Sequence, residues 1–282
     1  MIVPGSSSQS LAAALSNELD QPLAPVTTER YPDGELLASV PKIESESAII
    51  VASTTTSDDH IELLQLQDAL READVTEITT VIPYMGYGRQ DEAFEAGQPV
   101  SARAVARAIS TATDRVLVVS PHEKSSLEFF SVPATAISGA ALLADPLPEL
   151  ADPVFLSPDS GAIDIAEQVR DAYGEGEVDY FEKVRQSGSE VETTPSDVDV
   201  DGRDVVIADD IIATGSTMSE AISALDAPAR VFVTCVHPML ASNARTKLAR
   251  AGVEAVYGTD TIERAESEVS VAPVIAEALR RK

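Results

Sequence analysis

The chain has 282 residues, of which 44% are hydrophobic, and it carries a formal net charge of −27 at pH 7. This length suggests one large or two medium domains with buried cores. Nucleic acids and anionic membranes repel so acidic a chain, which excludes both as its main partners. No apolar stretch approaches membrane-spanning length, and Met1–Gly5 lacks the basic residues of a secretory signal, so we expect a cytoplasmic protein.

The basic residues are 15 arginines and only 5 lysines. Hyperthermophile proteins gain lysine together with glutamate, so the acidic composition indicates adaptation to concentrated salt rather than to heat. At molar salt the Debye length is about 3 Å, which screens the repulsion among surface carboxylates. The single cysteine, Cys235, lies in the apolar run Val231–Val236 and is interpreted as a buried, reduced thiol.

Short β-rich runs alternate with amphipathic helical patterns along the chain. This alternation predicts an α/β fold with mainly parallel sheets flanked by helices. Ser101 is a candidate helix cap. The expected strands are Ala48–Ser53, Ile78–Tyr84, Arg115–Ser120, Val154–Ser157, Asp204–Ala208 and Arg230–Val236, and the expected helices are Ile61–Glu72, Ser101–Ser110, Ile163–Ala172 and Ser219–Leu225.

The segment Ala144–Pro153 contains three prolines in ten residues and is a natural domain joint. We therefore expect two α/β domains, residues 1–145 and 146–282, with the last helix as a candidate to pack on the first of them. Residues 174–177 and 187–204 are polar, acidic and poor in periodicity, so they are predicted to be mobile loops.

The most informative stretch follows the strand Val205–Ala208. Two carboxylates, Asp209 and Asp210, end that strand, and a turn rich in hydroxyl groups and glycine leads into a helix. Hydroxyls and backbone N–H groups at a helix N-terminus suit a phosphate, whereas the carboxylates repel it and suit the vicinal hydroxyls of a sugar. The order therefore predicts a ribose 5-phosphate pocket. The alternative interpretation is an acidic strand end followed by an ordinary helix cap. It would explain Asp209 or Ser216 taken alone, but it explains the order of the whole segment poorly.

This loop resembles that of type I phosphoribosyltransferases and phosphoribosyl pyrophosphate synthases. Two further segments, Arg30–Glu35 and Val81–Asp91, the latter followed by Pro99–Ala106, extend the resemblance to ribose-phosphate pyrophosphokinase. It covers nearly the whole chain, from Ser6 to about Thr261. It implies two phosphoribosyltransferase-like α/β domains and a Mg²⁺-dependent transfer of the pyrophosphoryl group of ATP to the 1-hydroxyl of ribose 5-phosphate, which gives phosphoribosyl pyrophosphate and AMP.

The resemblance implies an ATP site in the first half of the chain. The flat face of Tyr31 suits adenine, and the carboxylates that follow it offer acceptors for the exocyclic amine. Arg89 is placed to meet phosphates as a fork of donors. Taken alone, the segment Tyr31–Glu35 is an ordinary Pro-Asp-Gly turn. The implied ATP-binding residues are Tyr31, Asp33, Gly34, Glu35, Arg89 and Gln90.

Metal ligands are implied at His122 and Asp159, each just after a predicted strand. Mg²⁺ prefers oxygen ligands, keeps most of its water and often touches substrate phosphates, so Asp159 is the easier ligand to accept and His122 could act through water. His60, in a helical pattern, is expected to be an ordinary, partly exposed residue. His237 matches a family position, and no role is assigned to it.

Lys183 and Arg185 precede the acidic segment 187–204 and match the family's catalytic cations. Preorganised cations are the main catalytic tool for phosphoryl-type transfers, since negative charge accumulates between the attacking and leaving oxygens. Without the family match, Lys183 and Arg185 could equally be two solvated cations on the surface. The implied ribose 5-phosphate-binding residues are Arg185, Asp209, Asp210, Ala213, Thr214, Gly215, Ser216 and Thr217.

Several positions depart from the common family pattern. Ala213 stands where many members have an acid, and Ser216 replaces a usual glycine. A second anion site activates many members through phosphate; there Glu44 replaces an arginine and Leu127 replaces a glutamine. A carboxylate and an alkyl group cannot cradle phosphate, so phosphate activation is predicted to be absent.

The resemblance therefore implies a Mg²⁺-dependent ribose-phosphate pyrophosphokinase with ATP and ribose 5-phosphate as partners. A homo-oligomer, dimer or larger, is implied because the family's adenine turn comes from a neighbouring subunit. Two alternatives remain: a non-catalytic regulatory homologue, which typically loses catalytic positions, and a phosphoribosyltransferase, which has one such domain. No P-loop sequence is present, and no general base is identified.

Overall fold

The computed structural model describes residues 1–185, 191–194 and 198–281; the side chains of residues 182–197 lie outside that description. The chain divides into two compact units. Unit 1 comprises Met1–Ser138, Asp260–Glu263 and Ser270–Lys282, and unit 2 comprises Gly139–Thr259 and Arg264–Val269. The chain thus returns to unit 1 at its C-terminal end. The domain boundary expected between residues 145 and 146 stays a prediction. None of the described helices is both long and apolar enough to span a membrane.

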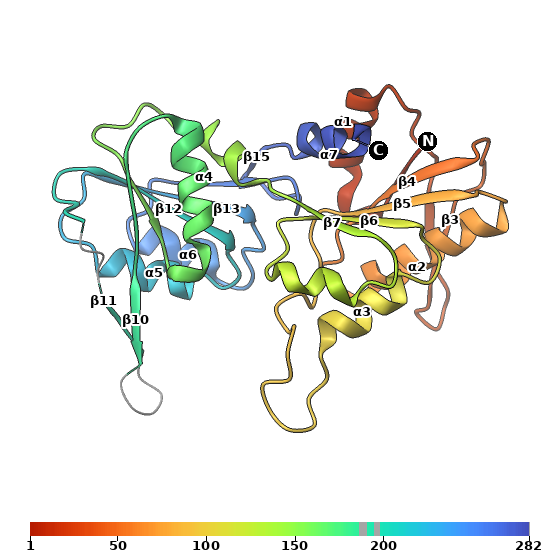
Figure 1. Ribbon diagram of the computed structural model, residues 1–282, viewed down its shortest axis with the longest axis horizontal. Coiled ribbons are helices and arrows are strands. Elements are labelled where there is room, and N and C mark those ends of the chain that lie inside the picture. Colours follow the sequence, from red (N-terminus) through yellow and green to blue (C-terminus); the bar gives the residue numbers. More distant parts are fainter. Residues whose placement is uncertain (186–190, 195–197, 282) are drawn as a thin grey trace. The chain divides into compact units, whose positions relative to one another are not determined.

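Unit 1 is built on a parallel sheet with the strand order β1-β4-β5-β6-β7. Figure 1 shows α1 and α7 on one face of this sheet and α2 and α3 on the other. An antiparallel hairpin, β2–β3, packs on α2. The elements are β1 (Ile2–Pro4), η1 (Ser6–Ser8), α1 (Gln9–Leu19), β2 (Thr27–Arg30), β3 (Leu36–Ser39), β4 (Ser47–Val51), α2 (Ser57–Glu72), β5 (Glu77–Ile82), α3 (Ser101–Ile109), β6 (Arg115–Val119), η2 (Lys124–Phe129), β7 (Ala134–Ile137) and α7 (Ala272–Arg280).

Helix α2 shows how this unit assembles. Its apolar residues Leu63, Leu66 and Leu70 recur at helical spacing and are fully buried against the sheet. Burial of each such side chain stabilises the fold by roughly 1.5–3 kcal/mol. A capping box fixes its start: the Thr56 hydroxyl accepts from Asp59 N, and the Asp59 carboxylate accepts from Thr56 N.

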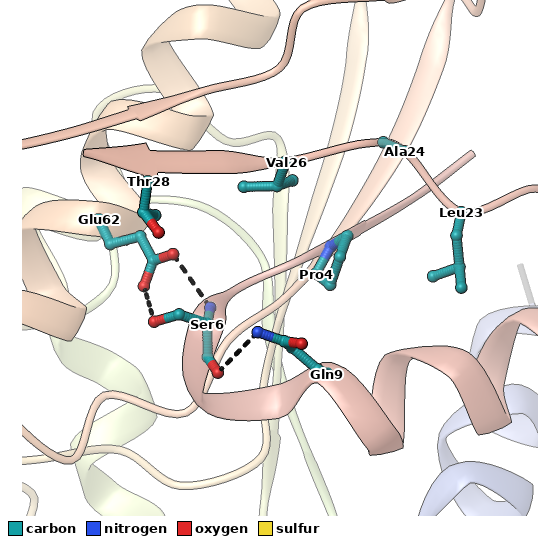
Figure 2. A pocket seen from close by; sticks show the side chains of 8 residues that line it. All are labelled: Pro4, Ser6, Gln9, Leu23, Ala24, Val26, Thr28 and Glu62. Atoms are coloured by element: carbon teal, nitrogen blue, oxygen red, sulfur yellow. Dashed lines mark hydrogen bonds between the residues drawn. The ribbon is translucent and has the colours of Figure 1, made fainter.

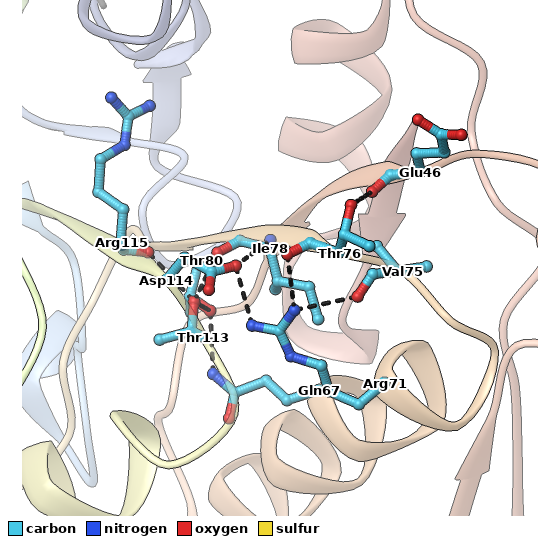
Figure 3. Close-up of polar contacts among 10 residues, drawn as sticks. All are labelled: Glu46, Gln67, Arg71, Val75, Thr76, Ile78, Thr80, Thr113, Asp114 and Arg115. Carbon is cyan, nitrogen blue, oxygen red and sulfur yellow. Dashed lines mark hydrogen bonds and ion pairs between the residues drawn. The ribbon is translucent and has the colours of Figure 1, made fainter.

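A polar network ties α2 to β5 and to the start of β6 (Figure 3). Arg71 Nη2 donates to Asp114 Oδ2 at 2.8 Å, and Arg71 Nη1 donates to two loop carbonyls. Gln67 Nε2 donates to Thr80 Oγ1, which donates to Thr113 Oγ1, each at 2.9 Å. These bonds satisfy buried polar groups next to the sheet and fix how α2 lies on it.

Unit 2 is built on a second parallel sheet, with the strand order β15-β14-β13-β12-β8-β9. Helices α5 and α6 contact each other, and α4 contacts β8, β9 and β12. A separate antiparallel pair, β10–β11, lies outside this sheet. The elements are η3 (Ala140–Ala144), β8 (Val154–Ser157), η4 (Ser160–Ala162), α4 (Ile163–Tyr173), β9 (Glu177–Tyr180), β10 (Glu182–Arg185), β11 (Val191–Thr194), β12 (Asp204–Ile211), α5 (Ser216–Ser223), β13 (Arg230–His237), α6 (Ala244–Arg250), β14 (Ala255–Thr259) and β15 (Ser267–Val269).

The central strands of unit 2 are almost continuously apolar because both of their faces are covered. Residues Val205–Ala208 in β12 and Val231–Val236 in β13 are buried along their length. At the start of these strands the buried carboxylate of Asp204 accepts from Arg230 Nε at 2.9 Å and from Ala151 N at 2.6 Å. Cys235 is buried and free, as predicted.

The predicted α/β class and its parallel sheets are confirmed, and the structure corrects several details. Strand β12 continues to Ile211, so Asp209 and Asp210 lie on the strand rather than after it. Helix α5 begins at Ser216, which places Ser216 and Thr217 in its first turn rather than in the preceding turn. The predicted loop 187–204 contains strand β11, which pairs with β10. The rest of that prediction falls partly on residues 187–190 and 195–197, outside the described residues.

Candidate functional site

The predicted adenine turn is the tip of the β2–β3 hairpin in unit 1. Tyr31 N donates to Glu35 O and Gly34 N donates to Tyr31 O, each at 2.9 Å, while Asp33 Oδ1 accepts from Glu35 N at 3.2 Å. All five residues from Tyr31 to Glu35 are exposed, and Tyr31 keeps 49% of its surface open. The turn therefore presents an aromatic face and two carboxylates to the outside of this chain.

Arg89 and Gln90 lie several residues beyond β5, in an irregular segment rather than at the end of the strand. The Arg89 side chain is exposed. The Gln90 side chain is half-buried, and its Oε1 accepts from Ser101 Oγ at 2.6 Å. Ser101 was predicted to cap α3, and that was wrong. Val100 is the N-cap, and the Ser101 hydroxyl donates to the Gln90 side chain instead.

The segment that carries Arg89 is held by close backbone packing. Gly86 N donates to Thr54 Oγ1 at 2.9 Å, and Thr54 N donates to Tyr84 O at 2.9 Å. A Cβ built on Gly86 would lie 1.9 Å from the Thr54 carbonyl oxygen, so only glycine fits there. Tyr87 adopts a positive φ of 62°, which is unusual for an aromatic residue.

The first turn of α2 contacts both parts of the predicted ATP site. Ser57 Oγ lies 2.9 Å from the Tyr87 hydroxyl, and the His60 ring centroid lies 5.4 Å from that of Tyr87. Asp58 pairs with Arg30 at the base of the adenine turn. His60 was expected to be partly exposed, and that was wrong: it is buried, and burial lowers its pKa. The hairpin and the Arg89 segment are thus anchored at one helix end.

His122 is exposed and follows β6 in unit 1, so the structure leaves it accessible. Its predicted role toward a metal remains a prediction. Among the described residues, no group of three or more His, Cys, Asp and Glu side chains is arranged to hold a metal ion.

A cavity of about 280 Å³ lies beside the start of α1 in unit 1 (Figure 2). Its one acidic side chain, Glu62, is 3% exposed and accepts from Ser6 N at 3.0 Å and from Ser6 Oγ at 2.6 Å. Those bonds satisfy the buried carboxylate within the protein. None of the predicted binding residues lines this cavity. The lining residues are Pro4, Ser6, Gln9, Leu23, Ala24, Val26, Thr28 and Glu62.

The predicted ribose 5-phosphate loop joins β12 to α5 in unit 2. Gly215 is the N-cap of α5 with φ 70°, a left-handed conformation that favours glycine. Its backbone also approaches α6, since a built Cβ would lie 3.3 Å from Ala244 O. Thr214 and Thr217 are exposed, and Thr214 Oγ1 lies 3.3 Å from Ser216 Oγ. Hydroxyl groups and the first N–H groups of a helix therefore meet at one place, as an anion site requires.

On β12, the carboxyl group of Asp209 has a shifted pKa. Burial raises the pKa of the Asp209 carboxyl well above its ordinary value, and the nearby carboxylates of Asp210 and Asp159 raise it further. Asp159 is half-buried, and its Oδ1 accepts from Gly161 N at 3.0 Å. The fold thus brings Asp159 close enough to Asp209 for their charges to interact. A cation or sugar hydroxyls would favour the ionised form of these groups.

Lys183 and Arg185 lie on strand β10, opposite Thr193 and Val191 of β11. Their side chains are outside the described part of the structure. His237 is buried at the end of β13, opposite Ile211.

The sequence analysis did not identify two of the side chains that contact these segments, and it gave a third another role. Thr54 accepts from Gly86 N, Lys247 on α6 donates from Nζ to Ser216 Oγ at 2.7 Å, and Ser101, predicted as a helix cap, donates to Gln90. Nothing local indicates the contacts of Thr54 and Ser101, because their partners are more than ten residues away along the chain. The rarity of lysine in this chain was the one available signal for Lys247.

Comparisons with known proteins agree with this architecture. Residues 1–112 match the model of the N-terminal domain of ribose phosphate pyrophosphokinase, and residues 127–270 match that of the phosphoribosyl transferase domain. A ribose-phosphate pyrophosphokinase of Halobacterium salinarum is 66% identical over 281 residues, covering 99% of this chain and all of the relative. One of Methanosarcina mazei is 44% identical and covers 99% of this chain and 94% of the relative.

A solved structure gives the same picture. The crystal structure of phosphoribosylpyrophosphate synthetase from Mycobacterium smegmatis superposes with a TM-score of 0.83 at 28% identity, covering 99% of this chain and 97% of that chain. The fold described above is therefore shared along nearly the whole length of both chains.

Proposed function

Because the chain belongs to the ribose-phosphate pyrophosphokinase family, we propose that its predicted site residues serve that family's reaction. The enzyme transfers the pyrophosphoryl group of ATP to the 1-hydroxyl of ribose 5-phosphate and releases phosphoribosyl pyrophosphate and AMP. The observation that carries the residue assignment is the β12–α5 loop, where two carboxylates precede a helix N-terminus rich in hydroxyl groups.

Ribose 5-phosphate binds in unit 2 with its phosphate at residues 213–217 and its ring hydroxyls on Asp209 and Asp210. The reason is electrostatic: the helix N-terminus attracts the phosphate dianion, while carboxylates accept hydrogen bonds from neutral hydroxyls. Separation of these two kinds of group along one loop fixes the direction of the sugar. The 1-hydroxyl is then held in one orientation, which is worth several orders of magnitude in rate.

ATP binds in unit 1. Adenine lies against Tyr31 and donates from its amine to the carboxylates of Asp33 and Glu35, and the phosphates meet Arg89 and Gln90. Ser101 holds the amide oxygen of Gln90, so the amide nitrogen is the part directed to an acceptor. Exposure of the whole adenine turn fits its use by a second copy of the chain, and a homo-oligomer is therefore part of this proposal.

Lys183 and Arg185 act on the transferring group. Their positive charges stabilise the charge that develops between the attacking and leaving oxygens, and they do so more in the transition state than in the ground state. Arg185 also contacts the sugar phosphate. The 1-hydroxyl oxygen attacks the β-phosphorus of ATP, and the bond from that phosphorus to the oxygen bridging to the α-phosphate breaks, so that AMP leaves with the bridging oxygen. The hydroxyl proton is released to solvent, and no side chain is assigned as its acceptor.

The carboxylates of unit 2 fit a magnesium ion. Asp159 lies close enough to Asp209 for their charges to interact. Burial is the main reason that the pKa of Asp209 is raised, and the neighbouring carboxylates add to it, so a bound cation would favour the ionised form of this group. Mg²⁺ takes one or two carboxylates together with water and substrate phosphates. Asp159 would hold it, and the ion would supply neutralisation of the ATP phosphates. The metal role predicted for His122, in unit 1, stays part of this proposal as a separate contact.

The test is product formation in molar KCl, which screens the charge of −27. We expect AMP and phosphoribosyl pyrophosphate only when ATP, Mg²⁺ and ribose 5-phosphate are all present. ADP in place of AMP would indicate an ordinary kinase. Absence of any ribose-dependent product would instead favour a non-catalytic homologue of the same fold.

A further inference from the structure

Lys247 reaches the predicted phosphate loop from a neighbouring helix of the same unit. It lies on α6, and its Nζ donates to Ser216 Oγ at 2.7 Å, across 31 positions of sequence. Ser216 is the first residue of α5, and its Oγ also lies 3.3 Å from Thr214 Oγ1. An ammonium group and two hydroxyl groups therefore form one connected cluster at the helix N-terminus.

The charge of Lys247 is not neutralised within the described residues. No described carboxylate lies within ion-pair distance of its half-buried side chain, although the chain has 47 acidic residues against 20 basic ones. Arg245, two residues earlier on the same helix, is paired with Glu266. In so acidic a chain, an unpaired cation held at one point by a neutral hydroxyl indicates that its counter-charge comes from a ligand.

Packing keeps Lys247 in reach of the loop. The α6 backbone at Ala244 approaches Gly215 closely, and α5 and α6 contact each other. Lysine loses side-chain conformational entropy when it is fixed in one position. A lysine already tethered to Ser216 incurs less of that loss when an anion arrives, so the site is preorganised.

We propose that Lys247 is a ribose 5-phosphate-binding residue that contacts the phosphate group directly; this rests on the proposed function of the loop. Its ammonium carries three N–H donors, and only one is used on Ser216. The other two are available to phosphate oxygens. Since Ser216 accepts from Lys247, its own hydroxyl proton is directed away from the ammonium, toward Thr214 or the phosphate. Ser216, which replaces a usual family glycine, thus works as a pair with Lys247.

The experiment measures ribose 5-phosphate binding by calorimetry in molar KCl, together with the KM for each substrate. The variants are Lys247→Met, which keeps the length without the charge, Lys247→Arg, which keeps the charge, and Ser216→Ala. Arg250→Met on the same helix is the matched control, because Arg250 is exposed and its loss changes the net charge equally. Thermal unfolding of each variant checks the fold.

We expect Lys247→Met to weaken ribose 5-phosphate binding about 10- to 100-fold, as loss of a charge-assisted hydrogen bond predicts. The KM for ATP should change less than about threefold, Lys247→Arg should recover much of the affinity, and Arg250→Met should bind normally. Lys247→Met should also cost more than Ser216→Ala, since the charge acts on the ligand itself.

Two results overturn the proposal. If Lys247→Met binds ribose 5-phosphate with normal affinity, Lys247 does not contact the phosphate and the proposal is wrong. Equal losses in Lys247→Met and Ser216→Ala, with no further loss in the double variant, mean that the lysine only shapes the loop through Ser216. The unaltered protein is measured first. If it does not bind ribose 5-phosphate, the proposed function is refuted, and this outcome is distinct from a failure of the Lys247 proposal.

Discussion

Ser101 Oγ donates to Gln90 Oε1 at 2.6 Å and so fixes the orientation of the Gln90 amide. The bond joins the first residue of α3 to the segment that carries Arg89, and Ala102 N adds a bond to Gln90 O at 3.1 Å. Within the described residues the amide nitrogen of Gln90 has no protein partner. A ligand acceptor such as a phosphate oxygen can therefore use it.

Ser101→Ala should raise the KM for ATP about 3- to 10-fold, because Gln90 would then rotate freely and lose its preorganised donor. The KM for ribose 5-phosphate should stay within about twofold, since the proposed site for that substrate is in unit 2. Steady-state kinetics with each substrate varied in turn measure both. Ser125→Ala, at an exposed serine of unit 1, is the control. An unchanged KM for ATP would mean that the Gln90 amide does not contact the nucleotide.

Thr54→Val should destabilise unit 1 by about 1–3 kcal/mol, because the buried Gly86 N–H would lose its acceptor while the side-chain shape is kept. The same change should raise the KM for ATP, since Gly86 leads into the Arg89 segment. Thr54→Ser retains the hydroxyl and serves as the matched control. Urea unfolding and ATP kinetics measure the two effects. Equal stability of both variants would show that water replaces the hydroxyl.

Lys183→Ala should lower kcat about 10²- to 10³-fold while nucleotide binding stays nearly normal, since a cation aimed at transition-state charge adds little to ground-state affinity. Single-turnover rates and ATP binding by calorimetry separate the two quantities. Lys42→Ala is the control, because Lys42 is an exposed lysine of the same charge that pairs with Glu44. Near-normal turnover would reassign Lys183 to the surface.

Asp204→Asn should lower the stability of unit 2 at neutral pH. Hydrogen bonds from Arg230 hold the pKa of the Asp204 carboxyl below its ordinary value. A depressed pKa means that the stabilisation is complete above the unfolded pKa of about 3.9 and is lost as the pH falls through the folded value. The stability gap between the two proteins should therefore shrink below about pH 4.

Thermal unfolding from pH 7 to pH 3 at fixed KCl follows that gap. Asp226→Asn, at an exposed aspartate of unit 2, should show a small gap throughout. A gap for Asp204→Asn that stays constant down to pH 3 would contradict the assigned pKa direction.

Inorganic phosphate should not activate the enzyme. Glu44 is exposed and pairs with Lys42, and Leu127 packs against the unit 1 core, so neither offers a donor to an anion. ADP should then inhibit only by competing with ATP. Initial rates over a phosphate series at constant ionic strength measure this. Saturable activation of several fold, or ADP inhibition that excess ATP fails to overcome, would reveal another anion site.

The sequence by itself determined the α/β class, the central strands and the order of the sugar-phosphate loop. Apolar runs such as Val205–Ala208 and Val231–Val236 are long enough to identify buried parallel strands, because both faces of such strands must be covered. Gly215 in its left-handed cap likewise follows from local backbone sterics. Short elements such as β1, β2 and β15 were not predicted, since three or four residues carry too little periodicity.

Only the tertiary structure decided which distant side chains meet. Ser101 was predicted to cap a helix and donates to Gln90 instead. His60 was expected to be partly exposed and lies buried beside Tyr87, and Lys247 reaches Ser216 from another helix. Each of these contacts joins residues that are well separated in sequence, and no local propensity encodes such a distance. They arise because helices pack on shared sheets, and that packing sets which polar groups must satisfy one another.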